Sequence, residues 1–430
     1  MKKIILLLIL PLITTLMVTF IIAEEKPLMI NHTSMDTMQY DINNTTSIKK
    51  YGAIGNGIAD DTLAIQKAIN SKSKLFFPKG KYKVSNPIYP RSDSVLISNN
   101  ATIYYIKEHG VAILRPAFYF KNNIHNVDML GHWIFEGDSP HSNFDRTTAG
   151  PDDTYVQGIV IKTNCSNIYI ESLEGFNFTG GVFEIGTYPG ATPSHNIVVD
   201  KIKTYDCWNA NLSITNGTNI HIKDIETYGC ISNPSFAQAG LDIETNVPSD
   251  ILKNIQIDKI LAYNNEVGFQ VLTMTQAQKG VTVNHLTSHN NNDNGVSLIN
   301  ATDFTAVNIN IFDNSGAGIY IEGTFKNISL NHGKVSNNKN HGILANMDAS
   351  AITASSKNLT IELDIYNNHG YGIILSGTDK YPVNKFICSG KIYDDQTVKT
   401  QLTGVNVQNN VHDIHITAEV SGNKYYQVRE

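Results

Sequence analysis

One short motif recurs along the chain and constrains its fold more than any other feature. The segments NIYIESL, NIVVDKI, NIHIKDI and NIQIDKI begin at Asn167, Asn196, Asn219 and Asn254. Each alternates apolar and polar residues with a period of two, as a half-buried strand does. Weaker copies follow at steps of about 23 to 30 residues, with longer steps where loops insert. Such self-similarity indicates a solenoid, in which each repeat packs on its neighbours.

A second set of strand-like segments alternates with the first, and Asn-rich turns lie between the two sets. Examples are GVFEIG from Gly181, GLDIET from Gly240 and GIYIEG from Gly318, with turns such as HNNNDNG. Asn tolerates left-handed backbone and can hydrogen-bond to an Asn one coil away, and Gly permits a corner. We therefore expect an all-β fold, a right-handed parallel β-helix. The alternative is a β-propeller, whose blades need about 40 residues or more.

Residues 47–90 depart from the repeat and contain one clear helical pattern. Asp60 or Asp61 can cap a helix there. Its predicted apolar face comprises Leu63, Ile65, Ala68 and Ile69. The first coil of a solenoid needs a cover, and an amphipathic helix can supply one. We therefore expect residues 47–90 to form an N-terminal cap and residues 91–430 to form the β-helix.

The cap also carries a recognisable motif, in YGAIGNGIADDTLAIQKAI and FFPKGKYKV. It resembles the N-terminal cap of the pectate-lyase-like superfamily, which includes glycoside hydrolase family 28-related proteins and phage tailspike depolymerases. Asn56 stands where the family pattern has Asp. The resemblance implies a right-handed parallel β-helix with a short N-terminal helical cap. It leaves the reaction open, because the superfamily includes hydrolases, lyases, epimerases and non-catalytic binders.

The N-terminus predicts export. MKK precedes an apolar run over residues 4–23, followed by Glu24 and Glu25, which is typical of a secretory signal peptide in residues 1–23. The run is also about as long as a membrane span, so an uncleaved signal anchor in the membrane is the alternative. Polar residues 24–46 then read as a linker. We expect the body of the chain to be secreted or held in the cell envelope.

Composition narrows the possible partners. The net charge is −6 and basic runs are short, so nucleic acid is not an expected partner. Four cysteines are too few for a disulfide scaffold, and no HxH, HExxH or CxxC spacing indicates a metal site. Cys207 and Cys230 occupy matching places one coil apart, so they are either a disulfide or two stacked free thiols.

Aligning the second set of strands by their inward residues leaves two outward columns. The first column reads Glu184, Ser213, Asp242, Gln270, Ser297, Tyr320, and the second reads Gly186, Thr215, Glu244, Leu272, Ile299, Glu322. Coils lie about 4.8 Å apart, and successive outward residues on one strand lie about 6.6 Å apart. Asp242 and Glu244 therefore share a face, with Glu184 two coils away. Two carboxyl groups at such separations suit inverting glycoside hydrolysis better than retaining hydrolysis.

Site candidates follow from this alignment. The catalytic candidates are Asp242, Glu244, Glu184 and Asp206; Asp206 is otherwise a solvated turn residue. Crowding of carboxylates raises a pKa, as a general acid requires, although any solenoid face carries some acids. The substrate-binding candidates are Tyr205, Trp208, Tyr228, Gln270 and Tyr320. The aromatic residues near the columns either stack on sugar rings or pack within the fold.

The leading hypothesis is an exported polysaccharide-degrading enzyme, a glycoside hydrolase that uses paired carboxylates on a β-helix face. The alternatives are a non-catalytic glycan-binding surface protein and a polysaccharide lyase or epimerase. The sequence lacks the polygalacturonase signatures, and the central face offers Lys162 as its one cation. No cofactor is expected, except that Ca²⁺ could serve a lyase. The glycan and the oligomeric state stay open.

Overall fold

The computed structural model describes residues 42–106, 116–139, 156–186, 191–231, 238–274, 278–346 and 354–429. From Gln39 to Glu430 the chain forms one compact unit. The predicted signal in residues 1–23 and the predicted linker up to residue 41 lie outside the described residues. In the described ranges, no helix has both the length and the apolar character needed to cross a membrane.

The N-terminal cap forms as the sequence predicts, with one difference. It contains η1 (Ile42–Asn44), β1 (Thr46–Ser47), η2 (Ile48–Tyr51), β2 (Asn56–Asp60), α1 (Thr62–Ser71), β3 (Lys74–Phe77) and β4 (Gly80–Val84). Ile65, Ala68 and Ile69 of α1 are buried, but Leu63 is 84% exposed. Leu63 is therefore not part of the apolar face. Asp61 occupies the N-cap position, and its carboxylate accepts hydrogen bonds from the backbone amides of Ile54 and Gly55.

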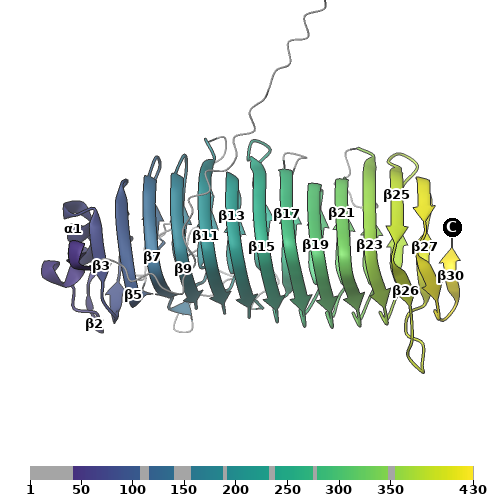
Figure 1. The fold of residues 1–430 in the computed structure, drawn as a ribbon, viewed down its shortest axis with the longest axis horizontal. Helices are drawn as coiled ribbons and strands as arrows, with labels where there is room; N and C mark the ends of the chain where they lie inside the picture. Colours follow the sequence, from purple (N-terminus) through teal and green to yellow (C-terminus); the bar gives the residue numbers. More distant parts are fainter. Residues whose placement is uncertain are drawn as a thin grey trace, which may run out of the picture. The chain divides into compact units, whose positions relative to one another are not determined.

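The remaining strands alternate between two sheets of parallel strands that run along the column of coils (Figure 1). Sheet A continues from β1–β4 through β5 (Ser94–Tyr105), β7 (His125–Glu136), β9 (Ser166–Phe176), β11 (Ser194–Tyr205), β13 (Gly217–Tyr228), β15 (Leu252–Tyr263), β17 (Gln278–His289), β19 (Thr302–Phe312), β21 (Lys326–Ser336), β23 (Ser356–Tyr366), β25 (Val383–Ser389), β26 (Lys391–Tyr393), β28 (Val411–Ile416) and β29 (Glu419–Ser421). Sheet B contains β6 (Phe118–Phe120), β8 (Ile159–Ile161), β10 (Phe183–Ile185), β12 (Leu212–Ile214), β14 (Ala239–Glu244), β16 (Val267–Leu272), β18 (Val296–Ile299), β20 (Ile319–Glu322), β22 (Ile343–Asn346), β24 (Ile373–Leu375), β27 (Thr403–Val407) and β30 (Tyr426–Arg429). This alternation is the predicted parallel β-helix.

Apolar columns fill the space between the sheets. In sheet B, Leu212 pairs in register with Phe183 on one side and with Leu241 on the other, and Leu241 pairs with Phe269. All four side chains are 0% exposed. Each coil contributes one layer, so neighbouring layers make the core continuous.

Two ladders of Asn side chains hold the turns, as the Asn-rich sequence predicts. The inner ladder comprises Asn211, Asn265, Asn291, Asn314, Asn338, Asn368, Gln401 and Asn423, all buried. Within it, the Asn291 side-chain amide donates to Asn314 Oδ1 at 2.8 Å, and Asn314 donates to Asn338 Oδ1 at 2.9 Å. These bonds satisfy polar groups that the core would otherwise leave unpaired.

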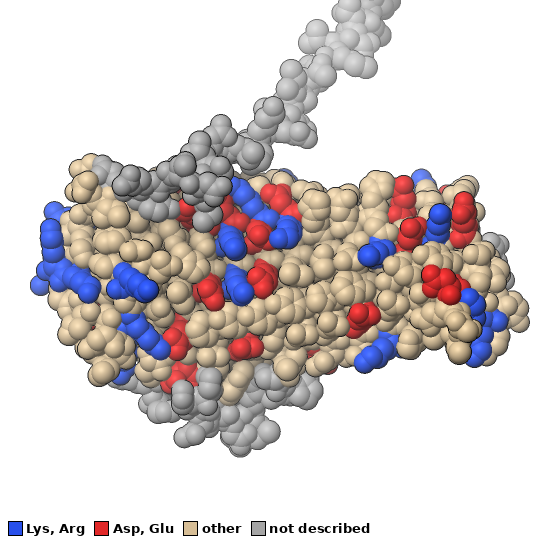
Figure 2. Space-filling view, turned by 60° about the horizontal axis from the view of Figure 1, so that its bottom comes forward, with Lys and Arg blue, Asp and Glu red and all other residues tan. Residues whose placement is uncertain are grey.

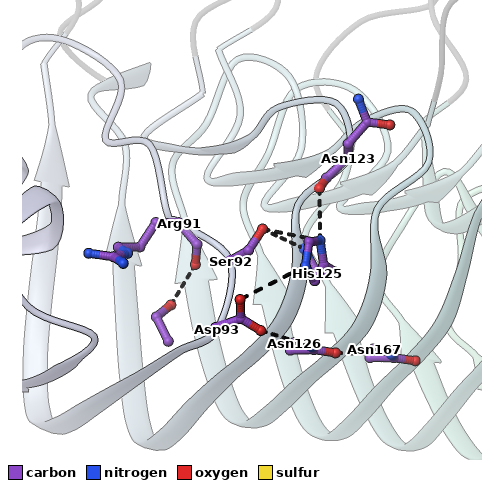
Figure 3. Close-up of polar contacts among 8 residues, drawn as sticks. Arg91, Ser92, Asp93, Asn123, His125, Asn126 and Asn167 are labelled. Atoms are coloured by element: carbon purple, nitrogen blue, oxygen red, sulfur yellow. Dashed lines mark hydrogen bonds and ion pairs between the residues drawn. The ribbon is translucent and has the colours of Figure 1, made fainter.

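The outer ladder begins on the first coils, beside the cap (Figure 3). Asn126 donates from Nδ2 to Asp93 Oδ1 at 2.8 Å, and Asn167 donates from Nδ2 to Asn126 Oδ1 at 3.0 Å. All three residues have positive φ angles between 53° and 57°. Asn and Asp adopt this left-handed conformation at lower cost than other residues with side chains, which explains their recurrence at this corner.

Candidate active site

The two outward columns of sheet B form as the alignment predicts. Glu184 pairs in register with Ser213, Ser213 with Asp242, and Asp242 with Gln270. The column continues through Ser297 to Tyr320. In the second column, Glu244 leads through Leu272 and Ile299 to Glu322. The structure thus places Asp242, Glu244 and Glu184 on one face, in the predicted order.

Glu184 is held by two neighbours on the preceding coil. Its Oε1 lies 3.2 Å from Lys162 Nζ, and its Oε2 accepts a hydrogen bond from the Gln157 side-chain amide. A Cβ built on Gly186 would stand 2.7 Å from Glu184 Oε1 and 2.4 Å from Thr215 Oγ1. The missing side chain therefore lets the Glu184 carboxylate lean across the face toward Thr215. Sequence periodicity does not indicate Gln157, because its contact with Glu184 is made to the next coil.

Asp242 lies deeper than an outward position usually allows. Its side chain is 1% exposed, and its Oδ1 accepts a hydrogen bond of 3.2 Å from Gln270 Nε2. Burial, with the charge of Glu244 as the second cause, raises the pKa of Asp242 well above 3.8. Asp242 therefore carries its proton over a wide pH range.

Glu244 is half-buried and completes a cluster of three carboxyl groups, which we call the sheet B triad: Glu184, Asp242 and Glu244. Burial first, and then the charge of Glu184, raises the pKa of Glu244. Thr215, 6% exposed, precedes Glu244 in the second column and lies beside the Glu184 carboxylate. A carboxyl with a raised pKa beside a carboxylate paired with a lysine can act as proton donor and base.

The raised pKa values make a prediction about stability. In the folded state Asp242 and Glu244 titrate above 3.8 and 4.5 respectively, so the folded protein binds more protons than the unfolded chain in that window. Their contribution to stability is full below pH 3.8 and is lost as pH rises through the folded-state values. We expect the double variant Asp242→Asn, Glu244→Gln to gain stability relative to the parent as the pH rises above the unfolded-state values of 3.8 and 4.5.

Urea unfolding of both proteins across this pH range measures that difference. The variant removes the two titrating groups and keeps the shapes of the side chains. The pH dependence of the difference in free energy of unfolding between variant and parent therefore reports these two groups alone. A difference in free energy of unfolding that stays constant with pH would contradict the raised values.

Asp206 does not join the triad. It is exposed, and it lies at the turn that leaves β11, with a φ of 54°. Its charge acts on Tyr205, Tyr228 and Cys207, which lie at the end of sheet A and the following turn. Its position matches the turn residue that the sequence offered as the alternative, and nothing in its contacts links it to Asp242.

Of the two alternatives for Tyr205 and Tyr228, sugar stacking or packing within the fold, the structure shows packing. Both rings belong to a ladder that comprises Phe176, Tyr205, Tyr228, Tyr263, His289 and Phe312. Tyr205 lies 4.9 Å from Phe176 on one face and 4.8 Å from Tyr228 on the other, measured between ring centroids. Tyr263 covers the second face of Tyr228 at 4.9 Å. Other rings therefore occupy the faces that a sugar would need.

The other substrate-binding candidates have different surroundings. Trp208 is half-buried in the turn after β11, where its backbone amide donates to the Phe178 carbonyl at 3.0 Å. Gln270 is 8% exposed and bonds to Asp242. Tyr320 is half-buried, and burial and Glu322 raise its pKa to about 12. Gln270 and Tyr320 thus lie on the face of the triad, and Trp208 lies at the edge of the turn.

Of the two alternatives for Cys207 and Cys230, a disulfide or two thiols, the structure shows thiols. They are 1% and 0% exposed. Cys207 Sγ lies 3.5 Å from the Tyr205 carbonyl oxygen, and Cys230 Sγ donates to the Asn209 carbonyl. Cys207 thus has its backbone acceptor at the end of the preceding strand, and Cys230 has its acceptor in the turn one coil earlier. Burial raises the pKa of Cys207 to about 12, which keeps it protonated and unreactive.

No group of three or more His, Cys, Asp or Glu residues is arranged to hold a metal ion in the described part of the chain. The view in Figure 2 shows acidic and basic side chains interspersed on one side, without a broad patch of either sign. On that side the protein has no field that would select a strongly charged polymer.

One further cluster has the residue types of a hydrolytic triad, and the sequence analysis did not find it. Ser92, Asp93 and His125 meet on the first coils (Figure 3), with Ser92 Oγ 3.3 Å from His125 Nδ1. The same Nδ1 lies 3.1 Å from the Asn123 carbonyl oxygen, which needs a donor. An Nδ1 that donates to a carbonyl cannot accept the serine proton. The cluster therefore ties two coils together and is not a nucleophile–base pair.

Comparison with known proteins agrees with the coil architecture. Residues 190–359 match a family model described as a right-handed β-helix region. The pre-neck appendage protein of Bacillus phage phi29 is 23% identical over 383 aligned positions, which cover 66% of this chain and 44% of that protein. The corresponding protein of Bacillus phage B103 is 38% identical over 63 residues, 14% of this chain. The chain thus spans less than half the length of the phi29 relative.

Solved structures share the fold at low sequence identity. The A-module of mannuronan C-5 epimerase AlgE4 from Azotobacter vinelandii is 13% identical, with a TM-score of 0.55 over 90% of this chain and all of that one. The Agl-KA catalytic domain is 14% identical, with a TM-score of 0.52 over 92% of this chain and 70% of that one. Together with the parallel coils, these matches identify the chain as a right-handed parallel β-helix protein, consistent with the pectate-lyase-like superfamily that its cap resembles.

Proposed function

We propose that the chain is an exported enzyme that cleaves a polysaccharide by hydrolysis, with the sheet B triad as its catalytic centre. The observation that carries the proposal is the presence of three carboxyl groups on one face of sheet B, with Glu184 beside Thr215 and with Glu244 half-buried and its pKa raised. Among proteins that share the fold, one is named as an epimerase of mannuronan, a polysaccharide. Similarity to phage appendage proteins favours a location at a surface or outside the cell.

The roles within the triad follow from exposure and charge. Glu244 reaches solvent and holds a proton, so it donates that proton to the glycosidic oxygen as the bond to the anomeric carbon breaks. Glu184, held by Lys162 and Gln157, takes a proton from the water whose oxygen attacks the anomeric carbon. The electrons of the broken bond remain on the leaving oxygen, which receives the Glu244 proton.

Asp242 takes a different role from the one that its sequence position favours. At 1% exposure it is less accessible to a glycosidic oxygen than Glu244 is. A buried, protonated Asp242 lets Glu244 ionise and recover its proton without a negative charge on Asp242 to oppose it. We therefore assign Asp242 as a positioning residue that acts through Glu244.

A second candidate function is glycan binding without catalysis. The observation that favours it is the burial of Asp242, together with the similarity to phage pre-neck appendage proteins. In this case the triad would contribute hydrogen-bond acceptors to sugar hydroxyls, and Glu244 would need no proton.

A panel of polysaccharides tests the proposal. The protein is incubated with neutral and uronate polymers, and new reducing ends and the absorbance of unsaturated uronates are both followed. Hydrolysis gives reducing ends without the absorbance, and a lyase gives both. Neither signal on any polymer, together with retention of a polymer by the immobilised protein, would replace the hydrolase proposal with the binding function.

A further inference from the structure

The charges along sheet B indicate what kind of polymer the triad accepts. Between β10 and β20, the described outward positions carry four carboxyl groups and no cation: Glu184, Asp242, Glu244 and Glu322. The remaining outward side chains there are neutral, among them Ser213, Gln270 and Ser297. A polymer lying along the columns would pass these groups one after another.

Two lysines on the coils before the triad already have partners. Lys162, on the preceding coil, pairs with Glu184 at 3.2 Å. Lys121, one coil further toward the cap, lies with its Nζ 4.0 Å from the centroid of the Tyr89 ring. Neither can turn to a carboxylate on a substrate without giving up a contact within the protein.

The acidic character continues at the turn that borders this face. The charge of Asp293 acts on Tyr320 in the first column, and the charge of Glu266 acts on Asp293. Asp242 and Glu244 hold protons and Glu184 is paired with Lys162, so the negative charges that a uronate would meet are Glu322 in the second column and Asp293 with Glu266 at the turn. A sugar with a hydroxymethyl group in place of the carboxylate could instead donate hydrogen bonds from its hydroxyl to these carboxyl oxygens.

Resting on the proposed function, we infer that the triad acts on an uncharged polysaccharide and discriminates against polyuronates. The discrimination is electrostatic and arises from Glu322 and from the turn with Asp293 and Glu266, so it acts on sugars beyond the one being cleaved. Like charges about 6 Å apart, at an effective dielectric constant near 20, correspond to about a 100-fold difference in rate.

The test compares polymers that differ in one group. A neutral polymer that the protein cleaves is oxidised at C6, which converts the hydroxymethyl groups to carboxylates and leaves the linkage unchanged; native polyuronates are reduced at C6 for the opposite comparison. We expect kcat/KM to fall about 100-fold on oxidation at low salt, and the gap to narrow as salt screens the charges.

Variants identify the charges responsible. Glu322→Gln removes a carboxylate of the second column outside the triad, so the ratio of the two rates should shrink several-fold. Glu419→Gln changes an exposed glutamate of β29 in sheet A and should leave the ratio unchanged. Equal or faster cleavage of the oxidised polymer overturns the inference and leaves the hydrolase proposal standing. Failure to cleave any polymer of either kind overturns the proposed function, and the inference with it.

Discussion

Glu244→Gln should reduce polysaccharide hydrolysis by about 10³-fold, because the amide keeps the size of the side chain but cannot donate a proton as an acid does. The half-buried position of Glu244 and its raised pKa make it the strongest proton donor of the triad that reaches solvent. Glu184→Gln should cause a loss of similar size, since it removes the base. The measurement is the initial rate of reducing-end release from the polymer identified in the panel.

A matched control separates this chemistry from a general effect of Glu→Gln substitution. Glu362→Gln changes an exposed glutamate on β23, in sheet A, whose partner is His332 at 3.6 Å. We expect this variant to keep full activity. Asp242→Asn should lower kcat and shift the basic limb of its pH profile, because it acts through the proton donor Glu244. Full activity of both Glu244→Gln and Glu184→Gln would remove the triad from the mechanism.

Asn314→Ala should lower the free energy of unfolding by about 3 kcal/mol, because it removes several buried hydrogen bonds at once. The Asn314 side chain accepts from the backbone and side chain of Asn291, and it donates to the carbonyl oxygens of Ser288 and Phe312. At 0% exposure, water cannot replace these partners. Urea denaturation followed by far-UV circular dichroism measures the loss.

The outer ladder provides the comparison. Asn254 is exposed, has a φ of 55° and donates to Asn219 at 2.8 Å. Asn254→Gly keeps the left-handed backbone and loses only the exposed bond, so it should cost less than about 1 kcal/mol. Equal losses in the free energy of unfolding at Asn314 and Asn254 would mean that burial does not determine how much a ladder hydrogen bond contributes to stability.

The sequence determined the fold, the order of the coils and the two outward columns. Period-two strands fixed which side chains enter the core, and the similarity of successive repeats fixed which residues stand beside one another. The register of Glu184, Ser213, Asp242 and Gln270 follows from these two facts alone. The Asn-rich turns likewise predicted ladders, because each Asn recurs at the same corner of the coil.

Only the tertiary structure decided how each outward position is buried, and this changed the site. Alternation says that Asp242 leaves the core, but it cannot say that the side chain is then covered to 1% exposure. Alternation also does not predict that the rings of Tyr205 and Tyr228 stack on each other. Nor does it predict that Gln157 and Lys162 contact Glu184 on the next coil. Strand periodicity determines whether a side chain points into the core or away from it within one coil. Burial, ring stacking and charge pairing arise between coils, and they depend on side-chain rotamers and turns that the repeat does not encode.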